Sequence, residues 1–298
     1  MQMTKRPPHP AGIFPPRTRF APSPTGALHL GHAFSARVAA GAGGGRFVLR
    51  IDNIDHTRCR PGFAAQILDD LAWLGLRWHA PIAYQSDRMD AYSAALERLI
   101  ELDLLYPCYL SRAEVNALLS APHDDTATLV NTDHHLPADE RARRAEAGSA
   151  PAWRLRTAAA LAKTGPLSWH DALLDQDVSV NMGDFGDVVV ARKDIGTSYH
   201  LSVVVDDALD GVTLVTRGAD LANSTHVHRL LQALLGIESP GYLHHPLVTD
   251  ATGTRLAKRN QATSLTALRG AGYSPDDVID MMPEFLPFAP SRKGPDAI

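Results

Sequence analysis

Residues 19–32 of the 298-residue chain, RFAPSPTGALHLGH, constrain the fold more than any other segment. Pro22 and Pro24 each fix φ, and Gly26 permits backbone conformations that a β-carbon forbids, so the segment predicts a tight turn. The alanine-rich run at 33–42 predicts a helix. We therefore expect a strand, a short loop and the start of a helix in immediate succession.

Two histidines, His29 and His32, stand at the start of this predicted helix. A strand, a loop and a helix N-terminus in this order form a phosphate cradle at the edge of a parallel sheet. We therefore predict a nucleotide site in which both imidazoles face the α-phosphate, while Gly31 lets a flat adenine lie close to the backbone. A strand-to-helix turn with two incidental histidines is the simpler alternative.

Composition narrows the class of protein. Hydrophobic residues make up 45% of the chain, which is ample for a core, and no apolar run is long enough to span a membrane. The proline-rich residues 1–16 lack the apolar block of a signal peptide and predict a flexible arm. Two cysteines, Cys59 and Cys108, favour the reducing cytoplasm over a disulfide scaffold. A net charge of −4 argues against indiscriminate nucleic-acid binding, although a local basic face is compatible with it.

Strand and helix patterns alternate in the first third of the chain. A β-rich run at 47–51 predicts a second buried strand, Pro61 opens a helix through about residue 74, and Ser86 and Asp87 cap another that runs to about 104. This order predicts an α/β fold with a doubly wound parallel sheet.

The remainder of the chain has a different character. Residues 105–196 mix patterns and predict an inserted, smaller α+β domain, with a strand at 184–190 returning from it. Apolar, β-branched runs at 201–205 and 212–216 predict further strands, and Asn223 and Ser224 begin a helix to about 235. Residues 261–298 form a tail that is too short for another large domain.

The RFAPSPTG sequence followed by HLGH resembles the class I glutamyl- and glutaminyl-tRNA synthetases, whose HIGH-type motif it matches. The resemblance implies a Rossmann-type catalytic domain at 17–104 and 197–260, interrupted by the acceptor-type insertion. It further implies that ATP, with Mg²⁺, activates glutamate or glutamine to an acyl-adenylate, and that the acyl group passes to RNA.

A second motif of the family is a mobile lysine loop of KMSKS type. RLAKRN at 255–260 resembles its KLSKQN version, with Arg255 and Ala257 in place of the first lysine and the serine. Charge develops on the α-phosphate and on the departing pyrophosphate, so catalysis needs donors aimed at both. The resemblance implies that His29 and His32 serve the former and that Lys258 binds the phosphates and serves the latter.

Glutamate carries two carboxylates and an ammonium group, so its pocket needs arginines and an acid. Asp52 of RIDNID stands where the family has a glutamate, one methylene longer, and Asn53 replaces an acid. Asp55 with Arg58 predicts a structural ion pair. The glutamate-binding residues that the resemblance implies are Arg19, Phe20, Ala21, Pro22, Ser23, Asp52, Tyr199 and Arg217.

Some members of the family carry a zinc site in the insertion, where this chain reads YPCYLSR at 106–112. Cys108 matches one ligand, Leu110 stands where the second cysteine would be, and no later cysteine follows. The histidines in or near the polar stretch that follows are more often solvated than ligands. The sequence therefore predicts no metal site and a packed Cys108. Those histidines are His123, His134 and His135.

The acceptor is predicted from the length of the tail. Most members continue after the lysine loop into a sizeable anticodon-binding domain, and this chain resembles the truncated members that lack one. They attach glutamate, activated without tRNA, to queuosine in the anticodon of aspartate tRNA. The expected partners are L-glutamate and the queuosine-bearing anticodon stem-loop of tRNA(Asp), with no membrane, for a cytoplasmic monomer.

Three alternatives remain open at this stage. The chain could be a glutamate–tRNA ligase without an anticodon domain that charges a 3′ end. It could pass activated glutamate to an acceptor other than RNA. It could also be a non-catalytic relative that binds RNA or an amino acid.

Overall fold

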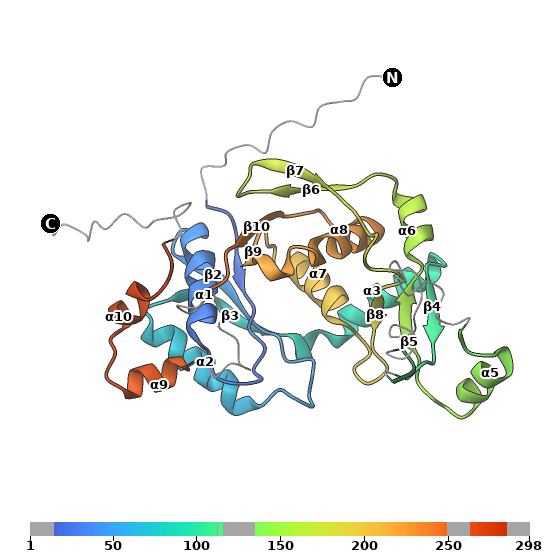
Figure 1. Ribbon diagram of the computed structural model, residues 1–298, viewed down its shortest axis with the longest axis horizontal. Helices are drawn as coiled ribbons and strands as arrows, with labels where there is room; N and C mark the ends of the chain where they lie inside the picture. Colours follow the sequence, from blue (N-terminus) through green and yellow to red (C-terminus); the bar gives the residue numbers. More distant parts are fainter. Residues whose placement is uncertain (1–14, 112, 116–134, 249–262, 285–298) are drawn as a thin grey trace, which may run out of the picture.

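The computed structural model describes residues 15–111, 113–115, 135–248 and 263–284. The predicted lysine loop at 255–260, with Lys258, lies outside the described residues, as do His123, His134 and most of the predicted arm. The described part is elongated (Figure 1). The first sheet lies at one end, a small antiparallel sheet lies toward the other, and a second mixed sheet with its helices lies between them.

The first sheet is parallel, with the order β1-β2-β3. Helix α1 follows the RFAPSPTG loop as predicted, and β2 and α2 confirm the predicted strand at 47–51 and helix from Pro61. Strand β3 was not predicted. The elements are β1 (Arg19–Phe20), α1 (Leu30–Ala42), β2 (Arg46–Ile51), α2 (Pro61–Trp73) and β3 (Arg77–Tyr84).

The second sheet has the order β7-β6-β10-β9, in which β6 and β9 run parallel to β10 and β7 is antiparallel to β6. Arg17 joins it to the first sheet, because the amides of Thr213 and Leu214 donate to its carbonyl oxygen at 2.9 and 3.3 Å. The predicted α/β fold with a parallel sheet is confirmed. The strands are β6 (Ser168–Asp171), β7 (Gln176–Ser179), β9 (Leu214–Gly218) and β10 (Gly241–His245).

The prediction of a strand at 201–205 is wrong, because these residues lie in helix α7 (Tyr199–Leu209). Ser198 caps the helix, its Oγ accepting from the amide of Leu201 at 3.3 Å. Residues 201–207 are all buried, so the segment has no polar face from which a helical period could be read. The cap and tertiary packing override the β-propensity of the three valines.

Helix α7 packs in a second core with three other helices. The predicted helix from Ser86 begins as the 3₁₀ turn η1 and continues as α3, and the helix predicted to end near 235 is confirmed as α8. These elements are η1 (Gln85–Arg88), α3 (Met89–Glu101), α6 (Thr157–Thr164) and α8 (Ser224–Leu235).

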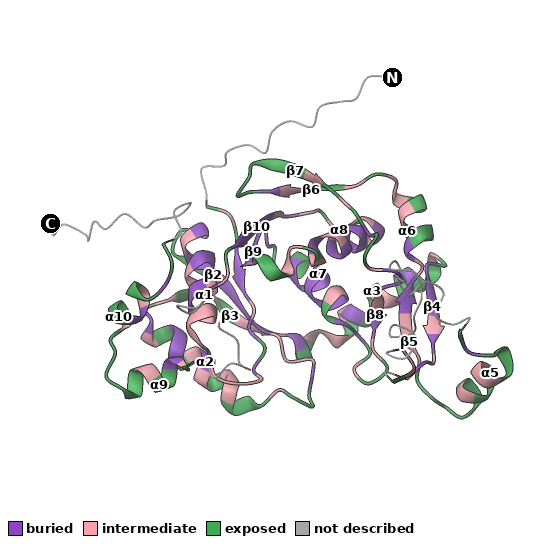
Figure 2. Ribbon diagram, in the orientation of Figure 1, coloured by how far each residue is buried: buried purple, intermediate pink, exposed green. Residues whose placement is uncertain are grey.

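Within residues 105–196, three strands form an antiparallel sheet of order β4-β5-β8, while β6 and β7 belong to the second sheet. Strand β8 begins five residues later than the strand predicted at 184–190. Helix α5 is mostly exposed, as is strand β7 (Figure 2). These elements are β4 (Leu105–Cys108), α5 (Ala138–Glu146), β5 (Ala152–Leu155) and β8 (Val189–Ala191).

Residues 263–284 form two short helices, α9 (Leu265–Gly270) and α10 (Pro275–Asp280), which pack on the first core. Leu265 and Val278 are fully buried there, and the amide of Leu265 donates to the carbonyl of Leu28 at 2.8 Å. Among the described residues, no helix is both long and apolar enough to cross a membrane.

The docking of α9 can be tested by Leu265→Ala. Because the side chain is fully buried, we expect the free energy of unfolding to fall by roughly 2–5 kcal/mol, measured by urea denaturation. Leu209→Ala removes the same atoms from a side chain that is 59% exposed and should cost no more than about 0.5 kcal/mol. Equal losses in the two variants would contradict the packing described here.

Candidate active site

A pocket of about 660 Å³ lies at the carboxyl ends of β1, β2 and β9, where ligands bind in open α/β sheets. Every predicted ATP- or glutamate-site residue that the structure describes lines it. Lys258 lies outside the described residues. The predicted residues brought together are Arg19, Phe20, Ala21, Pro22, Ser23, His29, Gly31, His32, Asp52, Tyr199 and Arg217.

The rings of the two histidines lie against each other at the start of α1, with centroids 3.8 Å apart and an angle of 37° between the ring planes. Nδ1 of His29 accepts from the amide of Gly31 at 3.1 Å, and Nδ1 of His32 accepts from the amide of His29 at 3.2 Å. In the neutral ring, the second nitrogen then carries the proton. The helix start therefore presents both residues as Nε2–H donors, which is the form that a phosphate oxygen requires.

Gly31 leaves space for this arrangement. A β-carbon at Gly31 would lie 3.1 Å from Cε1 of His29, closer than ordinary van der Waals contact. The absence of a side chain at Gly31 therefore makes room for the His29 ring. This is a second role for the glycine, beside the predicted one of letting adenine lie close to the backbone.

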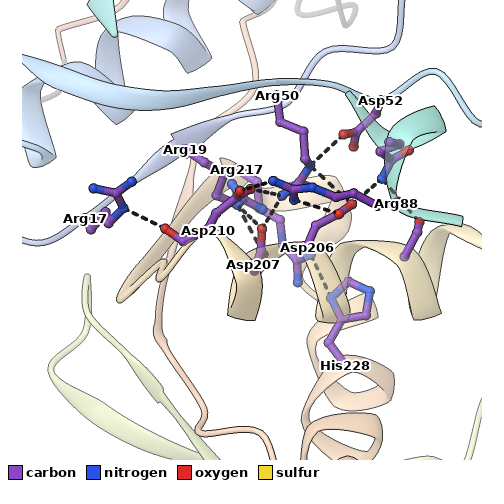
Figure 3. Close-up of polar contacts among 12 residues, drawn as sticks. Arg17, Arg19, Arg50, Asp52, Arg88, Asp206, Asp207, Asp210, Arg217 and His228 are labelled. Carbon is purple, nitrogen blue, oxygen red and sulfur yellow. Dashed lines mark hydrogen bonds and ion pairs between the residues drawn. The ribbon is translucent and has the colours of Figure 1, made fainter. Parts of the chain in front are cut away.

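A buried guanidinium joins β2 to α7. Arg50 has no solvent exposure, and its Nε donates to Asp52 at 2.8 Å. Its Nη1 donates to Asp207 at 2.8 Å and to Asp210 at 3.2 Å, and Asp206 lies 3.5 Å from its Nε (Figure 3). This set of contacts fixes the end of β2 against one face of α7.

Two further arginines complete this acidic cluster, in which the carboxylates are Asp52, Asp206, Asp207 and Asp210. Arg88 donates to Asp206 at 2.9 Å, and Arg19 donates to Asp207 at 3.2 Å. Four carboxylates thus face three guanidinium groups, which leaves one negative charge. Burial raises the pKa of Asp52 to about 6, although Arg50 acts in the opposite direction. The pocket therefore has a carboxylate that a substrate ammonium would stabilise.

Within the described part of the chain, Arg217 is a buried positive charge without a paired carboxylate, the opposite of the surplus negative charge in the acidic cluster. It is 5% exposed, and it donates from Nε to His244 at 3.3 Å, from Nη1 to His228 at 3.1 Å and from Nη2 to Thr225 at 2.6 Å. Among the described residues, no carboxylate forms an ion pair with it. A buried cation without a paired anion is costly, so this end of the pocket favours a ligand carboxylate.

Arg19 and Tyr199, both predicted to bind glutamate, have different surroundings. Nη1 of Arg19 donates to the carbonyl of Thr216 at 2.8 Å, in addition to its contact with Asp207, so the protein itself holds this guanidinium. Tyr199 begins α7 and is 39% exposed, with its ring centroid 5.5 Å from that of His228. The start of α7, rather than the edge of a strand, therefore places Tyr199 at the pocket.

The predicted ion pair of Asp55 with Arg58 is present, with 2.8 Å between Oδ2 of Asp55 and Nε of Arg58. Asp55 lines the pocket, and its carboxylate is already paired by this contact. Asn53 bridges to Ser86, accepting from its amide at 2.9 Å and donating to its hydroxyl at 3.0 Å, which ties the end of β2 to η1.

Cys108 is buried in a small apolar cluster with Tyr106, Leu110 and Leu136. Leu110 occupies the place of the absent cysteine and contributes to the same cluster. In the parts of the chain that the structure describes, no three His, Cys, Asp or Glu side chains are grouped so that they could hold a metal ion.

Sequence reasoning missed two groups, the carboxylates of α7 and the histidines around Arg217. Asp206 and Asp210 are four residues apart, which places them on one face of a helix. The interpretation of 201–205 as a strand concealed this signal. His228 and His244 come from α8 and β10, and nothing local in the sequence indicates that they meet at Arg217.

Arg50→Met tests the acidic cluster. Removing this cation leaves buried carboxylates uncompensated, so we expect the free energy of unfolding at pH 7 to fall by about 3–5 kcal/mol. The deficit should shrink as the pH falls, because protonated carboxyls need no cation. Arg98→Met breaks only an exposed pair with Glu101 and should cost less than about 1 kcal/mol. A deficit in Arg50→Met that does not change with pH would contradict this account.

A family model for the catalytic domain of class I tRNA synthetases (E and Q) matches residues 16–285. The chain is also similar to proteins named glutamyl-Q tRNA(Asp) synthetase. It is 47% identical to the one from Rhodobacter capsulatus over 275 residues, which cover 88% of this chain and 97% of that protein. It is 40% identical to the one from Nitratidesulfovibrio vulgaris, over 92% of this chain and 89% of that protein.

Among solved structures, the chain is similar to a glutamate tRNA ligase from Elizabethkingia meningosepticum in complex with its amino acid. The TM-score is 0.72 at 27% identity, and the match covers 89% of this chain and 60% of the ligase, so the chain spans about three fifths of that protein. The resemblance predicted from the two motifs is thereby confirmed. The chain belongs to the class I tRNA synthetase family specific for glutamate and glutamine (E and Q), among the relatives named glutamyl-Q tRNA(Asp) synthetase.

Proposed function

We propose that this protein activates L-glutamate with ATP and transfers the glutamyl group to queuosine in the anticodon of tRNA(Asp). The observation that carries the proposal is the charge pattern of the pocket. Arg217 is a buried cation without a paired anion, the cluster around Asp52 has a surplus negative charge, and His29 and His32 line the same pocket. An amino acid with a second carboxylate, bound beside a nucleotide, complements this pattern.

In the first step, Arg217 binds a carboxylate of glutamate and Asp52 binds its ammonium group. An oxygen of the α-carboxylate attacks the α-phosphorus of ATP, a new acyl–phosphate bond forms, and the bond to the departing pyrophosphate breaks. The Nε2–H groups of His29 and His32 stabilise charge on the α-phosphate. The ammonium group of Lys258 stabilises charge on the departing pyrophosphate, and Mg²⁺ bound with ATP would supply further positive charge there.

In the second step, a hydroxyl of the acceptor attacks the acyl carbon of the adenylate, and AMP leaves. Support for queuosine of tRNA(Asp) as the acceptor comes from the names of the relatives, which the chain matches over almost their full length. We further propose that the protein acts as a monomer in the cytoplasm.

The proposal is tested by pyrophosphate exchange and by RNA loading. We expect glutamate-dependent exchange without RNA, and transfer of labelled glutamate to tRNA(Asp) that carries queuosine but not to the unmodified transcript. Lys258→Ala should lower the exchange rate by a factor of about ten or more, because it removes a donor to the transition state.

Other outcomes would overturn parts of this proposal. Equal loading of both RNAs, blocked by periodate oxidation of the 3′ ribose alone, would identify a 3′-end ligase. Exchange without loading of any RNA would identify a different acceptor. No exchange with any amino acid would remove every enzymatic interpretation.

Asp52 makes glutamate binding dependent on pH. Its carboxyl, with a pKa of about 6, is ionised above that pH and can bind the ammonium group, and it is protonated below it. We therefore expect the Kd for glutamate, measured by calorimetry without ATP, to be constant above pH 7 and to rise about tenfold per unit below pH 6. Burial and Arg217 lower the pKa of His200 and of His244 to about 4, so these two rings do not titrate in that window.

Two variants sharpen this measurement. Asp52→Asn should bind glutamate weakly at every pH, whereas Asp52→Glu should keep both the binding and its loss in acid. If Asp52→Asn shows the same dependence on pH as the parent protein, another group holds the ammonium.

A further inference from the structure

The surroundings of Arg217 determine which of its hydrogen atoms remain for a ligand. A guanidinium has five N–H groups and no acceptor. Three of them are directed to His244, His228 and Thr225, one from each nitrogen. One hydrogen therefore remains on each of Nη1 and Nη2, and Arg217 lines the pocket.

The contact with His228 has only one possible direction. Because Arg217 can only donate, Nδ1 of His228 must accept, and the neutral ring then carries its proton on Nε2. That Nε2 lies 3.1 Å from Nδ1 of His200, which must accept in turn. Both imidazoles are thereby fixed as Nε2–H tautomers. The hydrogen bonds link His200 on α7, His228 on α8 and Arg217 on β9 in series.

The neutrality of His228 is built into its position. It is 3% exposed, and burial together with Arg217 lowers its pKa well below the ordinary value for histidine. A protonated ring would place a second cation beside Arg217 and would remove the acceptor. A carboxylate in the same position would hold the guanidinium equally well but would neutralise it.

We propose that His228, oriented by His200, is a positioning residue that holds Arg217 as an uncompensated cation and thereby makes the pocket selective for a carboxylate over an amide. The inference rests on the proposed function, since it assigns the basis of selection for glutamate over glutamine. The remaining N–H groups of Arg217 can satisfy two acceptor oxygens. The amide of glutamine would direct its own N–H₂ group at one of these donors. That N–H group of Arg217 and the amide N–H₂ group would then both lack an acceptor.

Three substitutions of His228 separate this role from a structural one. His228→Gln retains an acceptor, and we expect its Kd for glutamate to stay within about threefold of the parent value. His228→Leu has no acceptor and should raise the Kd and KM by about tenfold or more, with kcat changed by no more than a few fold. His228→Glu supplies an anion, and it should weaken glutamate binding most and reduce the preference for glutamate over glutamine.

The matched control is His226→Leu on the same helix. His226 packs against Trp169 and accepts from the amide of Asn181, without contact to Arg217. Its Kd for glutamate should stay within about twofold of the parent value, with thermal unfolding reported for every variant. Equal loss of binding in the Gln and Leu variants of His228, or an unchanged preference in His228→Glu, would overturn the proposal.

A readout that needs no activity distinguishes this inference from the proposed function. ¹⁵N NMR of histidine-labelled protein should show the His228 ring neutral and protonated on Nε2 at pH 7, with the signal assigned by its loss in His228→Gln. A ring that is protonated on Nδ1, or on both nitrogens, would overturn the positioning role. Absence of glutamate-dependent exchange in the parent protein would instead overturn the proposed function.

Discussion

The buried guanidinium of Arg50 is the interaction on which the rest of this structure depends. Arg50 belongs to the first sheet, whereas its partners on α7 lie more than 150 positions later in the chain. Burial of either set of charges without the other would cost several kcal/mol per ion, so each half stabilises the other. The same contacts hold the end of β2 against the C-terminal end of α7. Asp52, which follows β2, and Tyr199, which begins α7, line the same pocket.

The pocket combines two buried charge imbalances of opposite sign. On one side, the acidic cluster has more carboxylates than guanidinium groups, and on the other, Arg217 has only uncharged partners. Each imbalance would destabilise the protein if it stood alone in a closed core. At the wall of a cavity, each imbalance favours a ligand group of the opposite charge. The charges that the protein itself does not pair therefore determine which ligand charges this pocket favours.

The sequence predicted those parts of the site that depend on local chemistry. Proline and glycine in the RFAPSPTG loop, the histidines at the start of α1 and the strand before Asp52 are all short-range features, and the structure has them as expected. Helix α7 was missed because its apolar residues are buried on every side, so its period is invisible. The contacts of Arg50 and of Arg217 join residues from different elements, and no local pattern encodes such pairings.

Helix α9 has a consequence for the segment that precedes it. Its first residue, Leu265, is bonded to the backbone of Leu28, directly before the histidines, and Val248 lines the same pocket. The chain on either side of the predicted lysine loop therefore lies beside the predicted nucleotide site. The packing of α9 therefore fixes, beside the pocket, the chain that follows the predicted lysine loop, although α9 carries none of the predicted ligand-binding residues.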